Sequence, residues 1–178
     1  MDRALEDEFE AFVRGSYTRL LRLAYLLCGD AGHAEDAVQV TLAKTALAWP
    51  RLTRSDGVDR YVRRALINTV IAKRRRRWWS ETPTHDVDHA DSWDEFGRLD
   101  ERDALRRALA GLPARQRAAV VLRYYEDLSE AQAAEVLGCS VGNVKSLTAR
   151  GLQRLREIHR PPGIRELSNA ATTNAGEA

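Results

Sequence analysis

The stretch from Leu128 to Leu152 limits the possible folds more than any other part of the sequence, because it marks the ends of two consecutive helices. Ser129 and Gln132 have the spacing of a capping box, which opens a helix. Gly138 is a typical residue at a helix end, and Ser140 can cap a second helix after a very short turn. A helix, a tight glycine-bearing turn and a longer helix together predict a helix–turn–helix motif.

The second helix of this motif is expected to bury one side and expose the other. Four residues at helical spacing predict its buried side: Val144, Thr148, Gly151 and Leu155. The opposite side of its N-terminal half carries side chains that can bind phosphates or base edges in a DNA major groove. A helical hairpin with a solvated basic face remains the alternative. The outward residues are Asn143, Lys145, Ser146, Ala149 and Arg150.

The rest of the chain also favours helices. It has 11 glycines and 5 prolines in 178 residues and no alternating β-branched segment, so the sequence predicts an all-α fold. Apolar periodicity predicts helices over about 5–27, 31–49 and 58–79, the second ending before Pro50. A further helical unit begins near Ala104. The third helix is expected to bury Val58, Val62, Ala65, Thr69 and Ala72.

Charge is distributed in two adjacent blocks, although the net charge is only +2. Residues 60–79 hold eight basic residues and no acidic one, whereas residues 80–103 hold nine acidic residues and two basic ones. The basic block suits a polyanion such as nucleic acid, with a solvated helix end as the alternative. The acidic block has no apolar period and is expected to be a linker.

These observations predict two small helical domains joined by an acidic linker. The first domain is expected over residues 1–79, the linker over 80–103, and the helix–turn–helix domain over 104–160. Residues 161–178 are small and polar and are expected to form a disordered tail.

Two further helix faces are candidate sites. Glu35, Asp36 and Gln39 form an acidic and amide patch that suits a basic partner helix, with ordinary solvated surface as the alternative. Arg60, Arg64 and Asn68 are spaced four residues apart and line one side of the third helix. By itself, Asn68 is more typical of a structural polar residue on a packed helix.

No catalytic constellation can be assembled, so we expect neither enzymatic activity nor a cofactor. Cys28 and Cys139 lie far apart without metal-ligand spacing, which predicts reduced structural cysteines. A metal cluster in the acidic linker is a remote alternative. The acidic N-terminus is unlike a signal peptide, and no apolar stretch could span a membrane, so we expect a soluble cytoplasmic protein. The cluster would comprise His85, Asp86, Asp88, His89 and Asp91.

Several strings resemble the extracytoplasmic-function (ECF) group of the sigma-70 family, most closely its actinobacterial SigE-like subgroup. Residues 34–39 resemble the polymerase-binding helix of the family's second conserved region, and residues 61–69 resemble its −10 recognition helix. Residues 112–117, 122–129 and 141–146 resemble the fourth region, which binds the −35 element. The order and spacing of these strings carry the resemblance.

The resemblance implies a transcription initiation factor that binds core RNA polymerase and promoter DNA. Glu35, Asp36 and Gln39 would contact the clamp helices of the largest polymerase subunit, and the flap of the second-largest subunit would be a further contact. An anti-sigma factor is another candidate partner. The −10 element would be bound by Arg60, Tyr61, Arg64, Asn68, Lys73, Arg74 and Arg75. The −35 element would be bound by Arg123, Asn143, Lys145, Ser146, Ala149 and Arg150.

Three positions depart from the family pattern. Tyr61 stands where the family often has Trp, and Leu147 and Ala149 replace more usual polar and bulky residues, which leaves the preferred −35 sequence open. The alternative function is a helix–turn–helix regulator that acts without joining the polymerase. Such a regulator would need neither the polymerase-binding helix nor the −10 helix.

Overall fold

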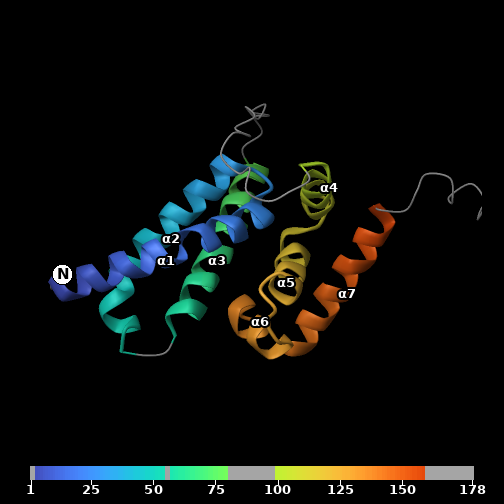
Figure 1. The fold of residues 1–178 in the computed structure, drawn as a ribbon. Helices are drawn as coiled ribbons and strands as arrows, with labels where there is room; N and C mark the ends of the chain where they lie inside the picture. Colours follow the sequence, from blue (N-terminus) through green and yellow to red (C-terminus); the bar gives the residue numbers. More distant parts are fainter. Residues whose placement is uncertain (1–2, 55–56, 80–98, 159–178) are drawn as a thin grey trace, which may run out of the picture.

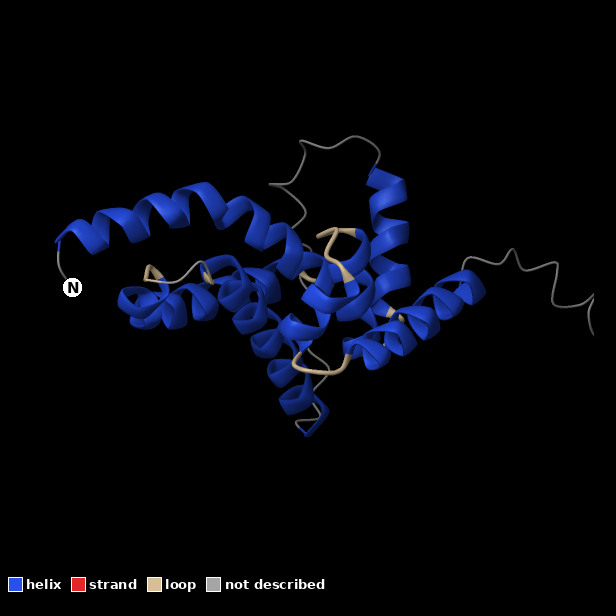
Figure 2. Cartoon of the chain, turned by 90° about the horizontal axis from the view of Figure 1, so that it is seen from below, coloured by secondary structure: helices blue, strands red, loops and turns tan. Residues whose placement is uncertain are grey.

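The computed structural model describes residues 3–54, 57–79 and 99–158, with side chains described up to Ala72 and again from Ala104. Every element in these ranges is an α-helix, which confirms the all-α fold (Figures 1 and 2). The acidic linker, its aspartates and histidines, and the tail lie mostly outside the described residues. The helices are α1 (Arg3–Cys28), α2 (Ala31–Leu52), α3 (Val58–Trp79), α4 (Leu99–Ala110), α5 (Ala114–Tyr124), α6 (Glu130–Leu137) and α7 (Val141–Ile158).

Helices α1, α2 and α3 pack on one another on one side of the molecule and form the first group of helices (Figure 1). The turn between α1 and α2 is fixed by Asp30, whose carboxylate accepts the backbone N–H of His33 at 2.7 Å as an N-cap. From this start, α2 buries Ala34 and Val38 and exposes the opposite side, as the sequence predicts. The cap fixes where α2 begins, and packing against α1 and α3 leaves its opposite side exposed.

Helix α2 does not end before Pro50 as predicted, but continues to Leu52. Proline lacks one backbone donor, yet the last turn still closes because Thr53 N–H donates to Trp49 O at 3.1 Å. The buried Trp49 ring also contacts Phe9 and Phe12 of α1, with both pairs of ring centroids 5.1 Å apart. This aromatic packing holds the proline-containing turn against α1.

The buried side of α3 differs from the predicted one. Val62 is buried and Val58 packs against the apolar cluster, as predicted, but Ala65 and Thr69 are only half-buried and Ala72 is exposed, so the predicted stripe fails toward its C-terminal end. The side is rotated because α3 is packed from two directions, by α1 and α2 and by α5 and α6. The residues of α3 that are fully buried are larger and apolar: Val62, Leu66, Ile67 and Val70.

The second group of helices, α4–α7, begins earlier in the chain than expected. Helix α4 starts at Leu99 instead of near Ala104, so its first turn falls within the predicted linker range. Acidic side chains in a first turn are compatible with the helix dipole, which explains why a charged segment can be helical there. The prediction of a linker up to residue 103 was therefore wrong at its C-terminal end, because a high density of charge does not by itself exclude a helix.

The helix–turn–helix motif forms as predicted. Ser129 and Gln132 make both hydrogen bonds of a capping box at the start of α6. Gly138 ends α6 with φ 61°, a left-handed conformation that favours glycine. The Ser140 hydroxyl then accepts the N–H of Asn143 at 3.2 Å and caps α7.

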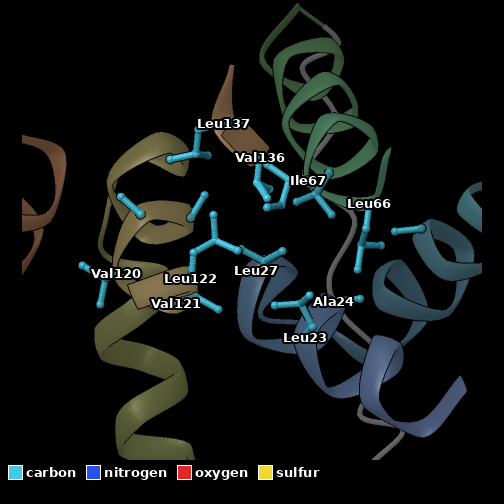
Figure 3. Packing of buried hydrophobic residues seen from close by; sticks show 14 of the residues in the cluster. Leu23, Ala24, Leu27, Leu66, Ile67, Val120, Val121, Leu122, Val136 and Leu137 are labelled. Atoms are coloured by element: carbon cyan, nitrogen blue, oxygen red, sulfur yellow. The ribbon is translucent and has the colours of Figure 1, made fainter. Parts of the chain in front are cut away.

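A single apolar cluster runs from the first group of helices into the second (Figure 3). Leu27 from α1 lies between Leu122 of α5 and the pair formed by Ile67 of α3 and Val136 of α6. A buried cation accompanies this contact: the Arg117 guanidinium donates to Leu27 O and Ala110 O, each at 2.7 Å. The two groups of helices therefore share one core.

Candidate nucleic-acid and polymerase interfaces

The outward side of α7 matches its prediction. Lys145, Ser146, Ala149 and Arg150 are exposed, and Asn143 is half-buried beside the Ser140 cap. Gly151 explains how α7 lies so close to α5, because a Cβ there would come within 2.7 Å of Val120 Cγ2. The absence of a side chain at this position therefore allows α7 to pack closely against α5, and this packing fixes the position of the exposed face of α7.

Two cations near this face have partners inside their own group of helices. Lys145 Nζ lies 3.5 Å from Glu130 at the start of α6, and both side chains are well exposed. Arg123, predicted as a −35 contact, donates from Nη1 to Leu128 O in the loop before α6. In this structure Arg123 therefore holds the loop that leads into the helix–turn–helix.

The basic side of α3 is placed as predicted, with Arg60, Arg64 and Asn68 exposed. Tyr61 is half-buried, and its hydroxyl reaches Lys44 O at 3.5 Å. Lys73, Arg74 and Arg75 lie on the same helix, but their side chains fall outside the described part. The helix thus presents a polar face that begins near its N-terminus.

The other group of helices reaches this basic side of α3, which the sequence did not predict. Arg60 Nη1 lies 3.0 Å from Glu135 of α6. Arg63 Nε lies 2.6 Å from Glu126 in the α5–α6 loop, and the Glu126 side chain is only 5% exposed. A Cβ on Gly138 would lie 3.5 Å from Nη2 of Arg64. Sequence periodicity carries no signal for such pairs, because the partners are more than 60 residues apart.

The α2 face contains all three predicted polymerase contacts, Glu35, Asp36 and Gln39, each exposed. Two large apolar residues continue the same outward side of the helix. Val40 is 44% exposed and Leu47 is 85% exposed. Apolar side chains exposed beside an acidic patch are typical of a protein-binding surface.

Among the described residues, no group of three His, Cys, Asp or Glu side chains could hold a metal ion. The linker cluster proposed as a remote alternative lies outside that part of the chain. Nor is any described helix both long and apolar enough to cross a membrane. The exposed polar faces of α2, α3 and α7 are therefore the features that a function must explain.

Comparison with known families decides between the remaining alternatives. The profile for "Sigma-70 region 2" matches residues 12–80, and the profile for "Sigma-70, region 4" matches residues 102–155. The chain belongs to the ECF group of the sigma-70 family. It is an RNA polymerase sigma factor, which binds core polymerase and directs promoter recognition and DNA opening at transcription initiation. Sigma factors are initiation factors and not catalysts, and a regulator acting apart from polymerase is not favoured.

Individual relatives agree with this assignment. The sigma factor is 37% identical over 155 residues to the RNA polymerase sigma-E factor of Streptomyces coelicolor, covering 84% of this chain and 85% of the relative. It is 30% identical to the ECF sigma factor SigM of Mycobacterium tuberculosis over 84% of this chain and 76% of the relative. Its fold is similar to that of the sigma factor RpoE in complex with the anti-sigma factor NepR from Bartonella quintana. That match has a TM-score of 0.71 and 27% identity, and covers 85% of this chain and 96% of the other.

Proposed function

We propose that residues 1–79 bind core polymerase and the −10 element, and that residues 104–160 bind the −35 element. Residues 80–103 would connect the two units and residues 161–178 would form the tail. The observation that carries this division is that three polar helix faces, on α2, α3 and α7, stay exposed within the two matched regions. Each face has the chemistry that its assigned partner requires.

The α2 face is our proposed contact with the clamp helices of the largest polymerase subunit. Glu35, Asp36 and Gln39 offer carboxylates and an amide to a basic partner. Val40 and Leu47 extend the surface with apolar area that would be removed from water on binding. A mixed surface of this kind fits a protein partner better than it fits DNA, whose phosphates would be repelled by the two carboxylates.

Core binding tests this assignment. Asp36→Arg together with Gln39→Ala should abolish binding to core polymerase while the helical circular dichroism stays unchanged. Glu8→Arg is the matched control, because Glu8 is an exposed acid at the other end of the same group of helices. If the double variant bound core polymerase as tightly as the unaltered chain, the α2 assignment would be wrong.

The α3 face is our proposed −10 surface. Arg60, Arg64 and the basic run at residues 73–75 would hold phosphates, and Tyr61 would pack beside the strand. Asn68 would form directional hydrogen bonds with a base that has left the stack, whose cost of a few kcal/mol the surrounding contacts would offset. Arginine contacts should therefore carry salt dependence, and Asn68 should carry sequence preference.

The α7 face is our proposed −35 surface. Lys145 and Arg150 would bind guanine edges or phosphates, Asn143 would bind adenine, and Ser146 and Ala149 would touch neighbouring bases. Arg123 is kept in this set, with its hydrogen bond to Leu128 O placing it at the edge of the motif. Lys145→Ala or Arg150→Ala should weaken duplex binding by about 1–3 kcal/mol if the contact is to a base.

Two further partners belong to this proposal. The flap of the second-largest polymerase subunit would contact the unit that contains α4–α7. An anti-sigma factor is supported as a partner because the RpoE structure with a similar fold was solved as a complex with the anti-sigma factor NepR. Since core polymerase is its main partner, we propose that the protein acts in the cytoplasm.

A further inference from the structure

The first turn of α6 carries an acidic residue beside the proposed −35 surface. Glu130 Oε2 lies 3.5 Å from Lys145 Nζ, and the two side chains are 39% and 63% exposed. Glu130 belongs to the first helix of the helix–turn–helix and Lys145 to the second, so the pair joins the two helices of the motif. A carboxylate beside a proposed DNA contact needs an explanation, because phosphates repel it.

Capping of α6 does not explain this acid. The start of the helix is closed by Ser129 and Gln132, whose neutral side chains accept the two hydrogen bonds of a capping box at 3.2 and 2.8 Å. An acid in the first turn also interacts favourably with the helix dipole, but that interaction does not require a partner on α7. The Glu130 carboxylate therefore contacts Lys145 in addition to any role at the helix start.

Arg150 on the same face provides the contrast. It is exposed, and its Nε donates to Ser146 O at 3.3 Å. That acceptor is a backbone carbonyl, which carries no net charge, and no ion pair joins Arg150 to a carboxylate among the described residues. The two basic residues proposed to bind the −35 element therefore differ in the charge that accompanies them.

A lysine on this face has two possible ligands, a phosphate oxygen or the edge of a guanine. The neighbouring carboxylate affects these two ligands differently. A phosphate carries a full negative charge and is repelled by Glu130, whereas O6 and N7 of guanine carry only partial charges. The Glu130–Lys145 pair is also neutral in total, so it gains little from the release of counterions. The acid therefore disfavours a phosphate contact of Lys145 more than it disfavours a base contact.

We propose that Glu130 is a positioning residue of the −35 surface, whose carboxylate keeps the Lys145 ammonium away from phosphates and directs it to a guanine edge. This role rests on the assignment of α7 to the −35 element and adds a specificity-determining residue on α6. Lys145 then contributes base preference more than affinity for the DNA backbone. Removal of the Glu130 charge frees Lys145 to bind phosphates, which raises affinity for any duplex and lowers discrimination between sequences.

Binding of a randomised duplex pool by reconstituted holoenzyme tests this role. Every duplex has the same downstream sequence and is randomised over the −35 region, and the bound DNA is sequenced. The unaltered chain should prefer guanine at one position, and Lys145→Ala should remove that preference. Glu130→Gln should reduce the same preference about two- to fivefold, as expected from the strength of an exposed ion pair, and leave the other positions unchanged.

Salt dependence provides a second readout, which a purely structural role of Glu130 would not change. Glu130→Gln should raise the affinity of holoenzyme for a duplex with a scrambled −35 region about two- to fivefold at low salt. The slope of log affinity against log salt should steepen by about 0.9, the value for one added phosphate contact. Lys145→Ala in the Glu130→Gln background should cancel both changes.

Glu157→Gln is the matched control. Glu157 is an exposed acid of α7, about three helical turns after Lys145, and its carboxylate accepts from Gln153 Nε2 at 3.2 Å. The substitution removes the same charge from the same domain and should change neither the guanine preference nor the salt slope. An effect equal to that of Glu130→Gln would overturn the positioning role, because it would reflect net charge alone.

The two variants separate this role from the −35 assignment itself. If Lys145→Ala removes a guanine preference but Glu130→Gln leaves both readouts unchanged at unchanged helical circular dichroism, Glu130 has no positioning role and the −35 assignment stands. If Lys145→Ala changes the preference at no position, Lys145 does not bind a base and the positioning role fails with that assignment. A guanine preference that depends on both residues supports the two together.

Discussion

Helices α3 and α7 both carry a basic face, but the two faces have different surroundings. On α3, Arg60 and Arg63 contact carboxylates that come from the other group of helices. On α7, Lys145 pairs with Glu130 of the same group, and Arg150 Nε donates to Ser146 O one turn earlier. The α3 arginines therefore have partners on other helices, whereas the cations of the α7 face have partners only within their own group.

This difference concerns the partners that each proposed DNA-binding face has in the folded chain. The α7 face needs no rearrangement to meet a −35 duplex, because its cations have only exposed local partners. On the proposed −10 face, Arg60 pairs with Glu135 of α6, a partner from the other group of helices. The following predictions challenge or refine this contrast between the two faces.

The largest effect is expected at the buried cation that joins the two groups. Arg117 is 1% exposed and donates to Leu27 O, Ala110 O and Leu112 O. Arg117→Met should lower the free energy of unfolding by about 3 kcal/mol, because buried carbonyls left without donors cost about 1–3 kcal/mol each. Urea unfolding followed by circular dichroism measures this loss.

The control for that substitution lies two residues earlier. Arg115 is exposed and donates from Nη2 to Leu137 O at 3.2 Å within its own group. Arg115→Met should cost no more than about 1 kcal/mol. Equal losses for the two variants would show that the hydrogen bond from Arg117 to Leu27 O, between α5 and α1, adds nothing to the free energy of unfolding.

The next effect concerns the close approach of α7 to α5. Gly151→Ala places a Cβ 2.7 Å from Val120 Cγ2, and the overpacking cost of about 1–3 kcal/mol should outweigh the gain in helix propensity of about 1 kcal/mol. Gly142→Ala on the same helix meets nothing within 4 Å and should be neutral or stabilising. The midpoint temperature of thermal unfolding and the affinity for a −35 duplex should fall for Gly151→Ala only. A neutral Gly151→Ala would show that α7 is not held at this depth.

The ion pairs of the two faces should differ in strength. A double-mutant cycle with Arg63→Met and Glu126→Gln should give a coupling energy above about 1 kcal/mol, since the pair is largely buried. The cycle with Lys145→Met and Glu130→Gln should give about 0.2–0.5 kcal/mol, as exposed pairs do. Urea unfolding at low salt measures both. Equal couplings would remove the contrast between the faces.

The smallest effect is a pH dependence at Tyr125. Burial raises the pKa of its phenol above the ordinary value of 10.0, and Glu126 raises it further, against opposing effects of Arg22 and Arg19. A raised pKa in the folded state means that this contribution to stability is complete below pH 10 and is lost as pH rises through the folded value. Tyr125→Phe should therefore reduce the fall in stability above pH 10. An identical fall in the variant would mean that Tyr125 plays no part.

The sequence predicted the features that depend on local chemistry. Capping at Ser129, Gly138 and Ser140 located the helix–turn–helix, and apolar spacing correctly assigned the exposed sides of α2 and α7. Local signals failed where packing comes from two directions, as on α3, whose buried side is rotated from the predicted one.

Other failures involve long-range pairs. Arg117 follows Arg115 and Gln116, and nothing nearby in the sequence indicates that its acceptor is Leu27, 90 residues away. Glu126 and Glu135 likewise read as ordinary surface acids until α3 is placed beside them. Pairs of this kind leave no periodic pattern in the sequence, so only the folded chain reveals the contacts between α1–α3 and α4–α7.

Transcription by reconstituted holoenzyme on two matched templates tests the central claim most directly. One template is fully duplex, and the other is mismatched over the −10 region so that it is already open. We predict that Lys145→Ala with Arg150→Ala lowers transcription from the duplex but leaves the pre-opened template active. On both templates, Asn68→Ala should instead remove the difference in transcription between the correct −10 sequence and a scrambled one. Equal failure of the two variants on the pre-opened template would contradict the division of promoter binding between α7 and α3.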